Sequence, residues 1–294
     1  STTLRQLLNT MEVLLSKIEV RLNPDVPPTG SDLAVVNAAR RSFNTRSDWD
    51  WETPAKDKPV GASYRPTLKD KDKRLIEFLA RGMTADDFES FKTDVSNADM
   101  GCNWEKDKLE CDKFVELLWQ WRNTPTHDTP FNHTFISFEV KAPIFVRAQL
   151  VKHEYLIMSE FSRRYITDGI EFYEPDYWRK AAPNKKQGSL EESIGPMLEQ
   201  GCKIKSGVHN ELCIELYEDL VSTGVAPEQA RMVLPQSTMT EWTWSGTLGA
   251  FAKMCQLRLH PEAQYEARLV AQEVYKYLKE YFPVSAPALV EGVK

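Results

Sequence analysis

The spacing of apolar residues along the chain predicts a series of helices. Apolar residues recur every three or four positions over residues 3–17 and residues 70–83. Ser31 is typical of a helix N-cap and precedes a predicted helix over residues 32–41. Further helices are predicted over residues 111–122, 143–154, 247–257 and 261–282, and within residues 189–223.

Short alternating stretches predict strands between these helices. They lie over residues 18–22, 134–140, 163–166, 169–173 and 238–244. Gly224 is expected to end the helix before it, and Pro283 and Pro287 to prevent helix near the end of the chain. Because strands and helices mix without a repeating strand–helix–strand unit, we expect an α+β fold rather than a doubly wound sheet. No change in composition divides the chain, so residues 1–294 are predicted to form one domain.

The composition is that of a folded protein with a small acidic surplus. Of the 294 residues, 41% are hydrophobic, which suffices to fill a core. The net charge of −6 argues against nucleic acid as a partner, because phosphate binding depends on a basic surplus. A small anionic ligand is compatible with this charge, since a few arginines suffice to bind it.

Three absences narrow the class of protein further. No apolar run is long enough to span a membrane, and the N-terminal residues lack the layout of a signal peptide. The five cysteines are odd in number and form no Cys-x-x-Cys pair, which argues against a disulfide framework or a zinc site. We therefore expect reduced thiols, a cytoplasmic location, no membrane partner and no bound metal.

The densest group of chemical residues lies over residues 147–165 (RAQLVKHEYLIMSEFSRRY). If residues 143–154 form a helix, Gln149, Lys152 and His153 share one of its faces. A solvated, charged helix edge would explain these residues without any function. Against that explanation, the charges interrupt an otherwise apolar segment, as expected of a site.

Arginines mark two more candidate positions. Ser162-Arg163-Arg164 resembles a phosphate cradle, because it combines a hydroxyl with guanidinium groups. Arg258 lies between leucines, where an unpaired charge is costly. It either pairs with Glu262 or Glu266, or projects into a ligand pocket where it stabilises developing negative charge.

Other catalytic patterns find little support. His127 and His133 flank a turn-rich stretch, and their spacing favours a hydrogen-bonded turn over a metal site. The chain contains no Gly-x-Ser-x-Gly, Walker or Rossmann pattern, so nucleophilic catalysis and a glycine-rich phosphate loop are not expected. Cys255 is expected to pack in the core.

Several blocks, taken in order, resemble the flavin-dependent thymidylate synthase (ThyX) family. That family carries Arg-His-Arg, seven residues and then Ser, followed by Arg-Tyr. This chain has Lys152-His153-Glu154, seven residues, Ser162 and then Arg164-Tyr165. The other matching blocks are AVVNAARRSF (34–43), HDTPFN (127–132) with His133, APIFVRAQ (142–149), ARMVLP (230–235) and LRLHPEAQYE (257–266).

The resemblance implies a fold and a reaction. The fold is a central, mostly antiparallel sheet flanked by long helices, with insertions at residues 44–69 and 84–110 and an extra N-terminal helix at residues 1–17. The reaction transfers a one-carbon unit from methylenetetrahydrofolate to C5 of a pyrimidine deoxynucleoside monophosphate, dUMP, with FAD and NADPH. The family forms homotetramers whose sites are shared between chains.

The resemblance also implies roles for individual residues. Arg258 matches the catalytic arginine that favours the N3-ionised uracil and so activates C5. Positions that match residues around the nucleotide are Gln149, Lys152, Glu160, Phe161, Ser162, Arg163, Arg164 and Arg231. Positions that match residues around the flavin are Ser42, His127, Thr129, Lys152, His153, Glu154 and Glu160. Thr247, Gly249 and Lys253 occupy a stretch in which the family often carries flavin-contacting Asn, Arg and His residues.

The departures from the family pattern lie mostly around the flavin. Lys152 keeps the charge of the first motif arginine but loses its fork, and Glu154 reverses the charge of the second. Ser159 stands where the family usually has Asn. Two alternatives therefore stay open. One is a divergent enzyme that methylates or hydroxymethylates dCMP or dUMP without flavin, and the other is a catalytically silent nucleotide-binding homologue.

Overall fold

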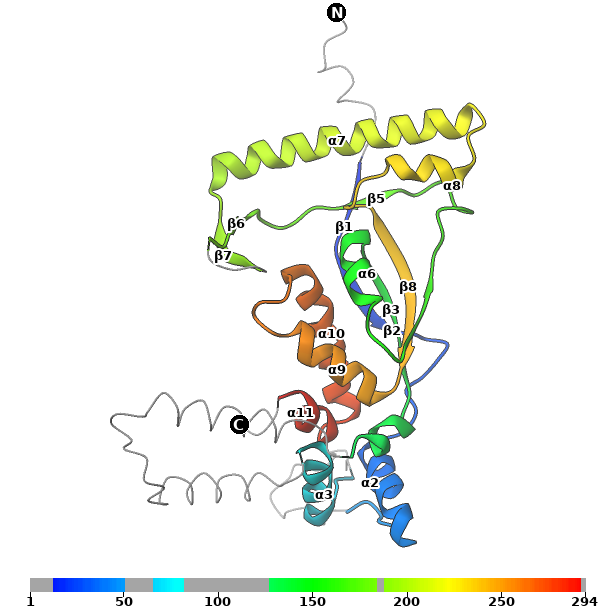
Figure 1. Ribbon diagram of the computed structural model, residues 1–294, viewed down its shortest axis with the longest axis vertical. Helices are drawn as coiled ribbons and strands as arrows, with labels where there is room; N and C mark the ends of the chain where they lie inside the picture. Colours follow the sequence, from blue (N-terminus) through cyan, green and yellow to red (C-terminus); the bar gives the residue numbers. More distant parts are fainter. Residues whose placement is uncertain (1–12, 51–65, 82–126, 184–187, 292–294) are drawn as a thin grey trace, which may run out of the picture. The chain divides into compact units, whose positions relative to one another are not determined.

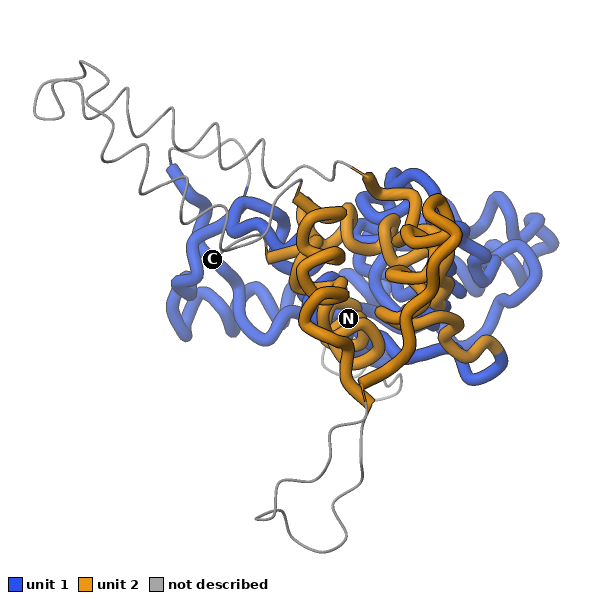
Figure 2. Tube along the Cα trace, turned by 90° about the horizontal axis from the view of Figure 1, so that it is seen from below, with its two compact units in different colours: residues 1–25, 137–245, 257–273 blue, residues 26–136, 246–256, 274–294 orange. Residues whose placement is uncertain are grey.

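The computed structural model describes residues 13–50, 66–81, 127–183 and 188–291. The chain divides into two compact units, each assembled from three stretches (Figure 2). The first contains residues 1–25, 137–245 and 257–273, and the second contains residues 26–136, 246–256 and 274–294. The one-domain prediction for residues 1–294 stays a prediction, because it concerns how these two units are joined.

A four-stranded sheet with the strand order β2-β3-β8-β4 organises the first unit (Figure 1). Its strands are β2 (Glu19–Leu22), β3 (Ile136–Pro143), β8 (Met239–Gly246) and β4 (Leu156–Glu160). β2 and β3 run antiparallel, with Glu19 opposite Lys141. The predicted strands at residues 18–22, 134–140 and 238–244 are thus confirmed, with small shifts at their ends, and so is the α+β class.

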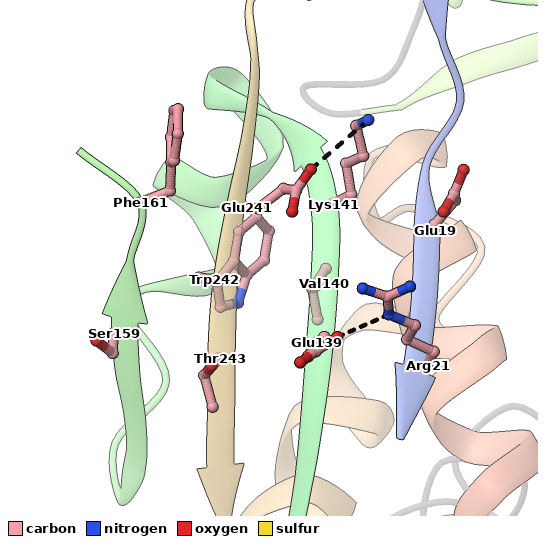
Figure 3. A pocket seen from close by; sticks show the side chains of 10 residues that line it. All are labelled: Glu19, Arg21, Glu139, Val140, Lys141, Ser159, Phe161, Glu241, Trp242 and Thr243. Carbon is pink, nitrogen blue, oxygen red and sulfur yellow. Dashed lines mark hydrogen bonds and ion pairs between the residues drawn. The ribbon is translucent and has the colours of Figure 1, made fainter. Parts of the chain in front are cut away.

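The two faces of this sheet differ because successive side chains of a strand point to opposite sides. On β8, Trp242 and Trp244 are buried, whereas Glu241, directly before Trp242, is exposed. The exposed face carries charged side chains from neighbouring strands (Figure 3). Its ion pairs are Arg21 with Glu139 at 2.7 Å and Lys141 with Glu241 at 3.6 Å.

The first unit has further elements, some of which contribute to a second apolar cluster. They are β1 (Leu14–Ser16), α6 (Ile144–Leu150), β5 (Glu171–Tyr173), β6 (Arg179–Ala181), β7 (Ser189–Ser193), α7 (Pro196–Ser222), α8 (Pro227–Ala230) and the 3-10 turn η3 (Arg231–Val233). Phe172, Ile214, Tyr217 and Ala230 belong to the cluster. α7 is the long predicted helix, and it ends before Gly224, whose φ of +93° suits glycine.

The second unit is mostly helical. Its elements are α2 (Asp32–Arg40), η1 (Arg41–Phe43), α3 (Asp70–Arg81), η2 (Thr129–His133), α11 (Ser285–Val290), the greater part of α9 (Leu248–Arg258) and the end of α10 (Tyr265–Tyr281). Buried Asp32 connects two of them, since its carboxylate accepts hydrogen bonds from the backbone N–H groups of Val284 (2.8 Å) and Ser285 (2.9 Å). Burial raises the pKa of Asp32.

Three predicted elements of the first unit are wrong. Residues 14–16, predicted as helix, form β1, which pairs in parallel with β5. The helix predicted over residues 143–154 ends at Leu150, because the chain then turns and Tyr155 adopts a left-handed backbone with φ of 63° before β4. Residues 163–166 form a turn rather than a strand.

One helix was not predicted, and some predictions lie outside the described residues. Pro287 lies in the first turn of α11, where a backbone N–H has no partner to lose, so it does not prevent the helix. The predicted helix over residues 111–122, the insertion over residues 84–110 and residues 3–12 lie outside the described part of the chain. Among the described residues, no helix combines the length and apolar character needed to cross a bilayer.

Replacing Ser31 by Ala tests the helix start that the sequence predicts. The Ser31 hydroxyl accepts a hydrogen bond from the backbone N–H of Ala34 at 3.3 Å. We expect S31A to lower the free energy of unfolding by about 1 kcal/mol, the usual cost of losing such a cap, in a urea titration. Ser31→Asp keeps an acceptor and should retain stability. Equal stability of S31A and the unaltered protein would contradict a stabilising cap.

Candidate functional site

A cavity of about 490 Å³ in the first unit brings together several residues that the sequence singles out. Gln149, Lys152 and Arg258 line it, and Arg179, Gln264 and Glu266 complete its polar wall. Three of these side chains are cationic, and one is a carboxylate. The cavity is therefore suited to an anionic ligand.

Arg258 organises this cavity from the end of α9. Its Nε donates a hydrogen bond to Nε2 of His153 at 2.9 Å, and its Nη2 donates to the backbone carbonyl of Gln149 at 3.1 Å. Lys152 and His153 lie in the turn after α6, so the prediction that they share a helix face with Gln149 is wrong. Arg258 joins His153 and Gln149 across that turn instead.

Burial, and after it the charge of Arg258, set the charge state of His153. Burial and the neighbouring guanidinium lower the pKa of His153 from 6.5 to about 4, so the imidazole is neutral near pH 7. Because its Nε2 accepts from Arg258, the ring proton sits on Nδ1. Burial also lowers the pKa of Arg258, yet a guanidinium stays protonated in proteins.

Of the two alternatives that the sequence leaves open for Arg258, the ion pair with Glu262 or Glu266 does not form in the described chain, and the arginine lines the cavity instead. Glu266 is buried and pairs with Arg179, with 2.5 Å between Oε1 and Nη2. Nε of Arg179 also donates to the Ser189 hydroxyl at 2.8 Å, and its guanidinium lies 4.3 Å from the centre of the Tyr265 ring. Sequence reasoning missed Arg179, because only the β6–β7 hairpin carries it to the cavity wall.

Glu266 also sets the orientation of two carboxamides. Its Oε2 accepts a hydrogen bond from Nε2 of Gln264 at 3.2 Å. Oε1 of Gln264 in turn accepts from Nε2 of Gln149. Because a carboxylate only accepts hydrogen bonds, Glu266 fixes the direction of both: Gln264 donates to Glu266, and Gln149 donates to Gln264. The Gln149 side chain is therefore oriented before any ligand binds.

The stretch from Glu160 to Arg164 lies at the end of β4, and each side chain has a distinct environment. The Glu160 carboxylate lies 2.5 Å from Nη2 of Arg147 and accepts from the Thr240 hydroxyl at 3.0 Å. The Ser162 hydroxyl accepts from the backbone N–H of Arg164 at 3.3 Å. The same hydroxyl accepts from Nε of Arg164 at 3.4 Å, so the structure brings the predicted hydroxyl and one predicted guanidinium together.

Arg231 and Glu154 lie apart from these contacts. Arg231 is exposed on η3, where its Nε donates to the backbone carbonyl of Glu228 at 3.2 Å. Glu154 is exposed in the turn before β4. Neither residue lines the 490 Å³ cavity in the described chain.

Two of the flavin-position residues line a separate cavity in the second unit. Ser42 and His127 border a space of about 770 Å³ whose walls include the exposed rings of Phe43 and Phe78. Arg74 also lines it. Aromatic walls beside cations suit a planar, anionic ligand.

The other flavin-position residues of the second unit are engaged with η2. The Thr247 hydroxyl donates to Oδ1 of Asn132 at 2.7 Å, and Lys253 pairs with Asp128 at 3.2 Å. A Cβ added to buried Gly249 would lie 2.5 Å from Oδ1 of Asn132, so a side chain at this position would have to displace the Asn132 carboxamide. Thr129 is the first residue of η2 itself. The turn at residues 127–133 is hydrogen-bonded, as the sequence indicates.

Metal and thiol chemistry gain no support from the described residues. Within them, no group of three or more His, Cys, Asp or Glu side chains is arranged to bind a metal ion. Cys255 is fully buried in α9, which confirms its predicted core position. Burial raises the pKa of its thiol, so the reactive thiolate is disfavoured.

The neutral state of His153 predicts a specific dependence of stability on pH. The histidine binds a proton near pH 6.5 when unfolded but only near pH 4 when folded, so the free energy of unfolding should fall as the pH falls through this interval. In H153Q this component should disappear. Urea titrations at several pH values measure it, with exposed His209→Gln as the control. An H153Q protein that loses stability as steeply as the unaltered protein would contradict the assignment.

Comparisons with solved structures place the fold. A UMP/dUMP methylase from Streptomyces cacaoi, solved with 5-Br dUMP, superposes with a TM-score of 0.64 over 95% of this chain and 97% of that chain, at 24% identity. The structure of that methylase with 5-Br UMP gives the same TM-score at 23% identity. At these identities the similarity establishes the fold alone.

Sequence comparisons establish the family. A flavin-dependent thymidylate synthase of Thermus thermophilus is 39% identical over 166 residues, which are 56% of this chain and 60% of that protein. One of Thermosipho africanus is 33% identical over 166 residues, covering 72% of its length. The chain thus spans less than two thirds of the first of these relatives. The sequence model of the family described as thymidylate synthase complementing protein matches residues 27–284. The chain therefore belongs to that family, as its sequence blocks indicate.

Proposed function

We propose that this protein transfers a one-carbon unit to C5 of a pyrimidine deoxynucleoside monophosphate, with dUMP as the substrate. The observation that carries the proposal is Arg258, which lines a cationic cavity and is oriented by neutral His153 and the Gln149 carbonyl. The relatives are named flavin-dependent thymidylate synthases, and the solved neighbour is a UMP/dUMP methylase. These names support dUMP ahead of dCMP.

The charge balance of the cavity favours a nucleotide monophosphate. Lys152, Arg179 and Arg258 face it, and Glu266 is already neutralised by Arg179. An anion therefore gains cationic partners without meeting an unpaired carboxylate on this wall. The fixed carboxamide of Gln149 adds a directional hydrogen-bonding group beside Arg258.

Arg258 supplies the chemistry that a uracil ring requires. C5 of uracil is a weak nucleophile, and negative charge on the ring, shared with N3, makes it stronger. A fixed guanidinium stabilises that charge as it develops, most effectively where water is excluded. Because His153 is neutral, it does not compete with Arg258 for the anion. No protein nucleophile is needed for this reaction.

In the second unit, the residues that line the 770 Å³ cavity fit a flavin, whereas Thr247 and Lys253 do not. Phe43 and Phe78 offer aromatic surfaces and Arg74 a cation, and Ser42 and His127 line the same 770 Å³ cavity, so these residues would hold an FAD. Thr247 and Lys253 are committed to Asn132 and Asp128. When bound, the flavin supplies reducing equivalents that originate from NADPH. Methylenetetrahydrofolate as the one-carbon donor and a homotetramer with shared sites belong to the same proposal.

A paired activity assay tests the function and the role of Arg258. With dUMP, methylenetetrahydrofolate, FAD and NADPH, we expect a C5-methylated product by mass spectrometry, and no product from dCMP. R258Q should lower kcat by about 10²–10³-fold, because it removes a preorganised charge. R21Q removes an exposed arginine that lies elsewhere and should leave the rate unchanged. Product from dCMP alone, or full activity of R258Q, would overturn the proposal.

Flavin binding gives an independent test of the second cavity. After reconstitution with FAD and dialysis, we expect the unaltered protein to retain an oxidised-flavin absorption spectrum. F78A should weaken FAD binding by about tenfold, because a base or ring that stacks on an aromatic gains about 1–3 kcal/mol. Exposed Tyr281→Ala is the matched control, since it removes an aromatic ring outside this cavity. FAD retained equally by F78A and Y281A would exclude this cavity as the flavin site.

A further inference from the structure

Two adjacent arginines after β4 differ sharply in their surroundings. Arg163 is partly buried, whereas Arg164 is exposed. The sequence treats them as equivalent members of one cationic pair. The structure separates them, because their guanidinium groups bond to different partners.

Arg163 closes the loop that contains it. Its Nη1 donates to the backbone carbonyl of Asp168 at 2.5 Å, and its Nη2 donates to that of Gly169 at 2.9 Å. The guanidinium also lies 4.7 Å from the centre of the Phe161 ring. Phe161 in turn donates its backbone N–H to the carbonyl of Glu241 on β8, at 2.9 Å. Arg163 thus ties the far end of the loop to the end that is anchored on the sheet.

The tightened loop orients Ser162 and Arg164. The Ser162 carbonyl accepts from the backbone N–H groups of Tyr165 (3.0 Å) and Ile166 (3.3 Å), which forms the turn. The Ser162 hydroxyl accepts from both N and Nε of Arg164, at 3.3 and 3.4 Å. A hydroxyl and an exposed guanidinium are therefore held side by side, and this combination recognises a phosphate group.

Arginine is required at position 163 for a geometric reason. Its planar fork bonds two successive carbonyls at once, whereas a lysine ammonium acts as a single point. Gly169 carries the second of these carbonyls, and its φ of +60° is a left-handed backbone conformation that favours glycine. Burial lowers the pKa of Arg163, as expected for a charge turned inward.

We propose that Arg163 is a positioning residue that closes the loop at residues 161–169 and so orients Ser162 and Arg164, the two positions that the family resemblance already assigns to the nucleotide. This inference rests on the proposed function for its ligand. It assigns Arg163 a role different from the direct nucleotide contact that family resemblance implies. Arg163 acts on the nucleotide only through the conformation of Ser162 and Arg164.

Binding of dUMP at several salt concentrations distinguishes a positioning residue from a phosphate contact. R164M should weaken binding and reduce the slope of log Kd against log [salt] by about 1, because one cation leaves the phosphate. R163M should weaken binding at least about fivefold with the slope unchanged, and added methylguanidinium should restore it. Lys180→Met removes an exposed cation paired with Glu192, and should change neither quantity.

Hydrogen exchange measures the loop without any nucleotide. In R163M the backbone amides of Tyr165 and Ile166 should exchange at least about tenfold faster, whereas in R164M and K180M they should stay protected. R163K, which keeps the charge, should give an intermediate rate and serves if R163M does not fold.

Three results would overturn the inference. The first is a salt slope for R163M that falls as it does for R164M, which would make Arg163 a direct contact. The second is unchanged dUMP affinity in R163M. The third is unchanged exchange at Tyr165 and Ile166. If the unaltered protein binds no dUMP, the proposed function fails, and the exchange rates still decide whether Arg163 closes the loop.

Discussion

The hydrogen bond from Arg258 to a neutral imidazole is the interaction on which the candidate site depends. A charged His153 would repel the guanidinium and would have no lone pair to accept from it. Burial keeps the ring neutral, and the ring then fixes the direction of the guanidinium together with the Gln149 carbonyl. The charge that the chemistry requires is therefore positioned by groups that carry none.

Two carboxylates of the first unit are likewise already paired with neighbouring groups. Glu266 is satisfied by Arg179, and Glu160 by Arg147 and Thr240. Glu266, which lines the cavity together with Arg258, thereby loses its capacity to neutralise Arg258, and both carboxylates keep a fixed orientation. Sites arranged in this way need little reorganisation when charge develops on a ligand, and this reduces the barrier that solvent would otherwise impose.

The sequence predicts elements well where one local pattern decides them. The cap at Ser31, the alternation in β8 and the end of α7 before Gly224 each depend on a few neighbouring residues. It fails at residues 143–154, because an apolar run cannot show that Tyr155 will turn the chain. The family blocks locate Arg258 and Gln149, yet the partners of these residues come from other segments. No local sequence pattern marks Arg179, because its ion pair with Glu266 depends on where the β6–β7 hairpin and α10 lie in the folded unit.

The close approach at Gly249 has a consequence for how this branch of the family can vary. A side chain at position 249 would displace the Asn132 carboxamide, and Asn132 in turn bonds to Thr247. A mutation at any one of the three positions alone breaks a contact or creates a clash, so their substitution effects are non-additive. The three residues therefore form an epistatic set. A larger residue at position 249 is therefore accommodated most easily together with a smaller one at position 132.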